Sequence, residues 1–185
     1  MSEKAEGKQT TARERTAYHE AGHAVVNLAL GRFVDLVSIV PDGASAGRCQ
    51  SHGSHWTTSA CPEGMDLHTF FSDQANESHE RAIVHTYAGE IAERKFSGRK
   101  PRGSADGDYR EIANHILSRW GNFLDAMPRL LELEVQAKAL LDDPVNWAAV
   151  EAIAKELLQH EELDGDRVHE IYRSISEQHR QHKAG

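Results

Sequence analysis

Five consecutive residues, His19-Glu20-Ala21-Gly22-His23, place two imidazoles four positions apart with a carboxylate between them. If this stretch is helical, residues four apart lie on one face, about 6 Å apart along the axis, and both imidazoles can bind one Zn²⁺ ion. Glu20 can then act as general base toward a water that zinc has acidified. The spacing therefore predicts a hydrolytic zinc site with His19 and His23 as ligands.

A hydrolytic zinc site also needs a third protein ligand and an open fourth position. The spacing of residues alone does not choose among several carboxylates and imidazoles. The candidates are Glu90 and Glu93 in a later helical segment, Asp106 and Asp108 where a loop enters the next helix, and the histidines His52, His55 and His68.

The helix that must carry the motif is predicted over residues 11–30. Thr11 and Glu14 have the spacing of a capping box, apolar residues follow at intervals of three and four, and Gly31 is suited to end the helix. A glycine in mid-helix costs about 1 kcal/mol relative to alanine. Gly22 therefore predicts that another element approaches this helix closely.

The rest of the chain predicts a mainly α fold with a small β-sheet, in which the motif helix packs in a helical bundle. Residues 33–40 are rich in Val, Ile and Leu and predict a strand, with a short partner at 46–50 and an exposed loop over 51–64. A break is expected at 163–165, and the apolar residues Leu130, Leu131, Leu133 and Val135 are expected in the core. Further helices are predicted over 67–96, 106–120, 125–141, 144–160 and 165–182.

Length and composition are those of an ordinary globular protein, with 185 residues, 39% hydrophobic and 27% charged. We expect one domain with a flexible tail (1–10), a zinc-binding catalytic core (11–122) and a C-terminal helical part (123–185). The net charge of −8 argues against a general nucleic-acid binder. No apolar run approaches a membrane span and no signal peptide is evident. With two cysteines, a cytoplasmic location is expected.

Five segments, in the same order, resemble the protease domain of the FtsH-type ATP-dependent zinc metalloproteases. They are TAYHEAGHAVV (16–26), VSIVP (37–41) with Gly47, YAGEIAE (87–93) with FSG (96–98), GSADGD (103–108) and LLQHEELDG (157–165). The resemblance implies a zinc metalloendopeptidase that cleaves unfolded or extended polypeptides. It also implies that His19, His23 and Asp108 bind zinc and that Glu20 is the general base.

The same resemblance assigns secondary roles to other candidates. Glu90 and Glu93 become structural or outer-shell residues, and Asp106 becomes a helix cap. The strand at 36–40 is expected to line the cleft, where an extended peptide could pair with it.

Two departures from the family bear on function. Gly107 replaces the Asn that precedes the family's ligand aspartate, and the chain contains no G-x-x-x-x-G-K-[ST] phosphate loop. Cleavage is therefore expected to be ATP-independent, unless a separate ATPase or adaptor delivers substrates, and the oligomeric state stays open. One alternative is a protease-like module that binds peptides or a partner with little turnover. A weaker one is a zinc hydrolase acting on a small molecule.

The remaining cysteines and histidines suggest a second site only weakly. Cys49, His52, His55 and Cys61 could hold a structural zinc ion, but the spacing is unfamiliar, so free thiols and solvent-exposed imidazoles are the preferred interpretation. The other histidines are expected at the surface or half-buried on helices. These are His79, His85, His115, His160, His169, His179 and His182.

Overall fold

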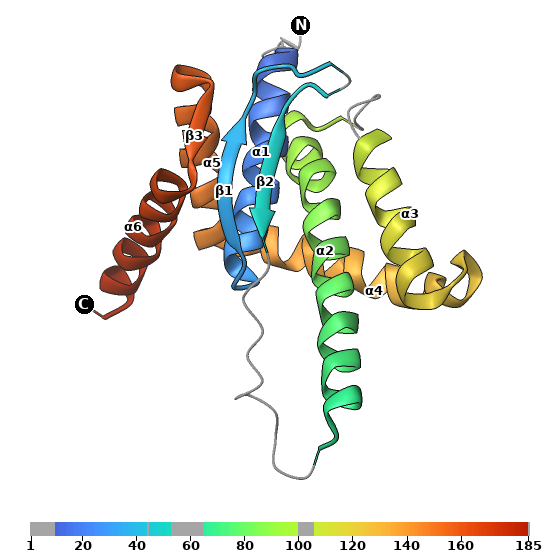
Figure 1. Cartoon of the computed structure of the whole chain (residues 1–185). Coiled ribbons are helices and arrows are strands. Elements are labelled where there is room, and N and C mark those ends of the chain that lie inside the picture. Colours follow the sequence, from blue (N-terminus) through green and yellow to red (C-terminus); the bar gives the residue numbers. More distant parts are fainter. Residues whose placement is uncertain (1–9, 44, 53–64, 100–105, 185) are drawn as a thin grey trace, which may run out of the picture.

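A computed structural model describes residues 10–43, 45–52, 65–99 and 106–184. The chain is mostly helical with one small antiparallel sheet, as predicted (Figure 1). Residues 1–9 of the expected tail and 53–64 of the expected loop lie outside the described residues. Among the helices described, none is long and apolar enough to span a membrane. In chain order the elements are α1 (Ala12–Ala29), β1 (Phe33–Ser38), β2 (Arg48–His52), α2 (Leu67–Ser97), α3 (Asp106–Trp120), α4 (Phe123–Asp142), α5 (Pro144–His160), β3 (Glu162–Asp164) and α6 (Gly165–Ala184).

Helix α1 begins and ends where its capping residues predict. The Thr11 hydroxyl accepts a hydrogen bond from the Glu14 N–H at 3.1 Å, and the Glu14 carboxylate accepts one from the Thr11 N–H at 2.7 Å. At the other end, Gly31 has φ +72°, and the Arg32 N–H reaches back to the Asn27 carbonyl at 2.9 Å. This left-handed ending satisfies carbonyls that the last helical turn would leave without donors.

Gly22 has the packing role that its place in mid-helix predicts. A β-carbon at Gly22 would lie 2.5 Å from the β-carbon of Ala92 and 2.7 Å from the carbonyl oxygen of Ala88, both on α2. Helix α1 therefore approaches the backbone of α2 closely, while α5 and the sheet cover its other sides. Figure 1 shows α1 in the middle of the molecule, behind β1 and β2.

The sheet has the order β2-β1-β3, and both outer strands run antiparallel to β1. Strand β3 was not expected, because 163–165 was interpreted as a break. Its Leu163 pairs with Val37, which pairs with Cys49 of β2 on the other side. Strand β1 therefore has no free edge over Leu36–Ser38, so a peptide cannot pair with these three of the residues 36–40 expected to bind it.

Helix α4 corrects the expected core. Leu130 and Leu133 are buried, but Leu131 and Val135 are 58% and 67% exposed. Positions 130 and 133 share one face of a helix, whereas 131 and 135 share a different one. Only the first face packs toward the rest of the described chain, so half of the apolar set lies outside the core.

Candidate metal centre

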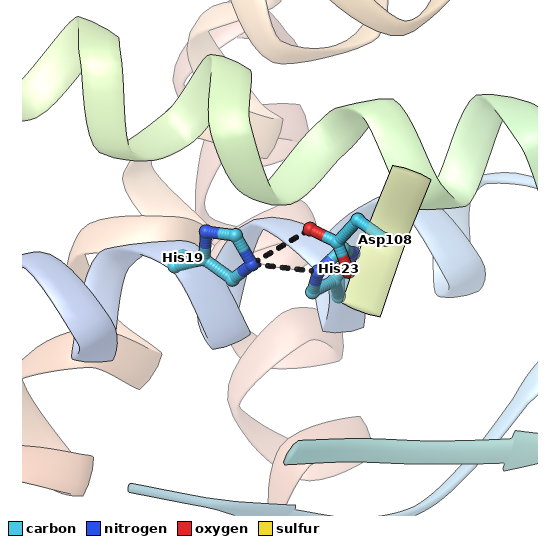
Figure 2. A group of neighbouring side chains, drawn as sticks. All are labelled: His19, His23 and Asp108. Carbon is cyan, nitrogen blue, oxygen red and sulfur yellow. Dashed lines mark hydrogen bonds and ion pairs between the residues drawn. The ribbon is translucent and has the colours of Figure 1, made fainter. Parts of the chain in front are cut away.

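Three side chains from α1 and α3 converge on one point (Figure 2). His19 and His23 lie one turn apart on α1, and their Nε2 atoms are 3.1 Å apart. Asp108, in the first turn of α3, places Oδ2 3.1 Å from Nε2 of His19 and Oδ1 3.6 Å from Nε2 of His23. The structure thus brings together the three residues expected to bind zinc.

The separations among these donor atoms suit a zinc ion. With bonds of about 2.0–2.1 Å, a tetrahedral zinc ion separates its ligand atoms by about 3.3 Å. Nε2 of His19 lies 3.1 Å from Nε2 of His23 and 3.1 Å from Oδ2 of Asp108, close to that value. One ligand atom from each of the three residues lies within 4.8 Å of the other two. The two imidazoles are buried, and the Asp108 side chain is 20% exposed. Two imidazole nitrogens and one carboxylate are also the donor types of catalytic zinc sites.

Neighbouring acceptors orient both imidazoles. His23 Nδ1 lies 2.8 Å from the His85 carbonyl oxygen, which can only accept, so Nδ1 carries the hydrogen. His19 Nδ1 faces the Glu93 carboxylate at 3.4 Å, an ion-pair contact without a well-aligned hydrogen bond. Both Nε2 lone pairs then point at each other and at Asp108, whose Oδ2 is buried without a well-aligned hydrogen bond from the described residues. The two lone pairs and the carboxylate oxygen repel one another unless a proton or a cation lies between them.

The charges of the site also favour a cation. Burial of His19 works to lower its pKa, but its contacts with Asp108 and Glu93 outweigh burial and raise the pKa to about 10. Burial of Asp108 works to raise its pKa, yet His23 and His19 hold that pKa well below its usual range. Negative charge that attracts protons to imidazoles also attracts a divalent metal, and the two compete for the same lone pairs.

Glu20, the expected general base, is buried beside the ligands. Burial raises the pKa of Glu20, and the two neighbouring imidazoles oppose that shift. Gly47, just before β2, comes so close that a β-carbon there would lie 2.8 Å from Oε1 of Glu20. The carboxylate therefore lies between the ligand helix and the start of β2.

A second glycine, Gly89 on α2, makes room for the imidazoles themselves. A β-carbon at Gly89 would lie 2.4 Å from Nε2 of His23 and 2.6 Å from Nε2 of His19. Sequence reasoning gave Gly89 no function, although it stands in one of the segments that carry the resemblance. Its requirement becomes visible only when α1 is packed against α2.

Three of the other candidates for the third ligand, Glu90, Glu93 and His52, make other contacts. Glu90 accepts a hydrogen bond from the Tyr109 hydroxyl at 2.6 Å, and Glu93 faces the outer nitrogen of His19 and Arg15. His52 pairs with Asp35 at 2.9 Å, at the far end of β2. The side chains of Asp106, His55 and His68 lie outside the described residues.

The second cluster of cysteines and histidines is described only in part. Cys49 is a free, partly buried thiol, whereas His52 is exposed. Three positions apart on β2, the two side chains belong to opposite faces of the strand. His55 and Cys61 lie outside the described residues.

One of the remaining histidines corrects the expectation of exposure. His85 on α2 is buried, with its ring centre 4.6 Å from that of His23. Burial and the neighbouring His23 hold the pKa of His85 well below its usual range, so the ring is neutral. His79 and His115 are half-buried, as expected, and their Nδ1 atoms lie 2.9 Å apart between α2 and α3.

Comparison with known proteins finds two relatives that are similar over most of this chain. The chain is 30% identical over 189 residues to ATP-dependent zinc metalloprotease FtsH 1 of Symbiobacterium thermophilum, covering 84% of this chain and 28% of that protein. Over most of its length, this chain is similar to FtsH zinc metalloproteases. It is also 27% identical over 206 residues to FtsH 2 of Methylacidiphilum infernorum, covering 88% of this chain and 29% of the relative. The chain spans under a third of either FtsH protein, and no protein-family model matches it.

Proposed function

We propose that this chain is an FtsH-type zinc peptidase domain that hydrolyses peptide bonds in unfolded or extended polypeptides. The observation that carries the proposal is the convergence of His19, His23 and Asp108 beside the buried carboxylate of Glu20. Similarity to two FtsH zinc metalloproteases over most of the chain supports it.

The roles follow from the positions of the side chains. His19, His23 and Asp108 would hold the zinc ion. When bound, zinc supplies Lewis-acid polarisation of a carbonyl and lowers the pKa of a water. Glu20 would take the proton from the attacking water and pass it to the leaving amine, so no covalent intermediate with the protein is needed.

Strand β2 is the better candidate for substrate recognition, now that β1 lies inside the sheet. Within the described residues, only one edge of β2 is paired, and that edge pairs with β1. An extended peptide can add to an open edge through main-chain hydrogen bonds. Because Gly47 brings the start of β2 against Glu20, a peptide on this edge would pass close to the general base.

The domain is expected to act on chains that are already unfolded. The 185 residues contain no phosphate loop, and both relatives are named ATP-dependent. An ATPase, in the same protein or in a separate one, or an adaptor would be needed to present folded substrates. We assign residues 11–122 to the catalytic core and 123–185 to the same domain, because α4 and α5 both contact α1.

The test compares zinc content and cleavage of unfolded casein for the native protein and Glu20→Gln. Glu20→Gln is expected to keep its zinc and to lose at least about 100-fold in cleavage rate, the range for removing a general base. Glu177→Gln, an exposed glutamate on α6, is the matched control and is expected to cleave normally.

The outcomes separate the alternatives. A native protein that binds zinc but cleaves neither casein nor a peptide library would be a binding module, and the protease proposal would be wrong. If Glu20→Gln still cleaves casein, only the role of Glu20 as general base would be contradicted.

A further inference from the structure

His23 and His85 are joined by two reciprocal hydrogen bonds between α1 and α2. The His23 Nδ1–H donates to the His85 carbonyl at 2.8 Å, and the His85 Nδ1–H donates to the His23 carbonyl at 3.2 Å. Both carbonyls can only accept, so both imidazoles have their hydrogen on Nδ1. The lone pair of His23 must therefore be on Nε2, the atom that faces His19 and Asp108.

The side chain of His85 contributes more than its carbonyl does. Any residue at position 85 would offer a main-chain oxygen, but the imidazole adds a donor and a ring packed at 47° against His23. These contacts fix the turn of α1 that carries the ligand. Gly89, one turn further along α2, leaves the two ligand rings no room to shift toward the helix.

We propose that His85 is a positioning residue for metal binding, which holds the His23 turn against α2 so that Nε2 stays aimed at the shared site. The inference rests on the proposed zinc site. It distinguishes the two imidazole ligands, because His19 is oriented by the carboxylate of Glu93 whereas His23 is oriented by a main-chain oxygen and a second ring. Outer partners of this kind commonly change metal affinity by about 10- to 100-fold.

Three substitutions separate the donor from simple filling of space. His85→Asn can place an amide N–H near the position of Nδ1, His85→Gln places its amide near Nε2, and His85→Leu fills the space with no donor. For each we would measure the zinc dissociation constant by competition with a chelator, the visible spectrum of the Co²⁺-loaded protein, and the thermal midpoint of the metal-free protein.

We expect His85→Leu and His85→Gln to bind zinc about 10- to 100-fold more weakly and to shift the Co²⁺ spectrum. His85→Asn should restore both affinity and spectrum, although all three metal-free variants lose part of the packing. If His85→Leu does not fold, the comparison of Asn with Gln still decides, because both carry the same amide donor and one methylene group separates the two positions of that donor.

Two results would overturn the positioning role of His85. One is native zinc affinity and a native Co²⁺ spectrum in His85→Leu, and the other is an Asn variant no better than Gln. Both differ from failure of the proposed function, in which the native protein binds zinc and cleaves no polypeptide. A native protein without zinc affinity would overturn both proposals.

Discussion

In the described part of the chain, two pairs of histidines bring ring nitrogens to 3.1 Å and 2.9 Å from each other, and the surroundings of the two pairs differ. His19 and His23 bring their Nε2 atoms to 3.1 Å within α1, and Asp108 reaches the same point from α3. His79 and His115 bring their Nδ1 atoms to 2.9 Å between α2 and α3. There the carboxylate of Glu111 lies 3.7 Å from Nε2 of His115, on the opposite side of the ring from Nδ1.

The comparison shows that a short distance between imidazoles does not by itself indicate a metal centre. A single hydrogen shared between His79 and His115 explains their separation fully. At the first pair, His23 Nδ1–H donates to the His85 carbonyl and His19 Nδ1 faces the Glu93 carboxylate. The carboxylate of Asp108 completes the donor set. We therefore expect zinc at the first pair and a shared proton at the second.

The largest expected effect comes from filling the space beside Gly89 that the imidazoles of His19 and His23 occupy. Gly89→Ala would place a methyl group 2.4 Å from Nε2 of His23, so at least one ligand must rotate away. We expect zinc affinity to fall by more than about 100-fold, beyond the usual effect of an outer partner. Stability should also fall by about 1–3 kcal/mol, as in other overpacked interiors. Chelator competition and thermal unfolding measure the two effects.

Gly107→Ala is the matched control, because a β-carbon there meets nothing within 4 Å. Gly107 lies in the same turn of α3 as Asp108. The Gly107→Ala variant therefore also tests whether a methyl group added to a helix near the site lowers zinc affinity by itself. We expect unchanged zinc affinity. Native zinc affinity in Gly89→Ala would show that the imidazoles do not bind metal from the positions described.

A smaller effect is expected from the partner of His19. Glu93→Gln keeps the shape of the side chain but removes the charge beside Nδ1 of His19, and should weaken zinc binding by about 10- to 100-fold. Glu90→Gln, three residues earlier on α2, retains an acceptor for Tyr109 and should bind zinc normally. Equal losses in the two variants would mean that the effect is general electrostatics and not orientation of His19.

The smallest expected effect concerns the pair His79 and His115, which should make the stability of the folded protein depend on pH. Burial and the neighbouring His115 and Arg119 lower the pKa of His79. In the unfolded chain, where the pKa of a histidine is about 6.5, His79 therefore becomes protonated at a higher pH than it does in the folded protein. The stability contributed by neutral His79 is therefore present above about pH 6.5 and is lost as the pH falls through the lower, folded pKa.

Urea unfolding at about pH 7.5 and about pH 5.5 tests this expectation. The native protein should lose more stability between the two than His79→Gln does, whereas His182→Gln, exposed on α6, should behave as the native protein. Identical pH dependence in native protein and His79→Gln would mean that the pair does not share a proton as described.

Local signals predicted the elements that carry the site. The capping box at Thr11 and the left-handed Gly31 each act within one or two turns of their own position. The sequence motif also identified His19 and His23 directly, because their spacing is set by the helix itself.

Features that depend on distant packing were not predictable in this way. Strand β3 has three residues, too few for an alternating pattern, and it exists because it pairs with a strand more than a hundred positions earlier. The roles inferred for Gly89 and His85 depend on contact with α1. Asp108 is indicated by the family resemblance, because spacing alone leaves several carboxylates possible as the third ligand.

The most direct test of the central claim is the zinc content of the native protein, Asp108→Ala and His115→Ala, each purified in the same zinc-containing buffer. We predict one tightly held zinc ion per chain in the native protein and in His115→Ala, and its loss in Asp108→Ala. Zinc retained by Asp108→Ala, or lost from His115→Ala, would contradict the assignment of the metal centre to His19, His23 and Asp108.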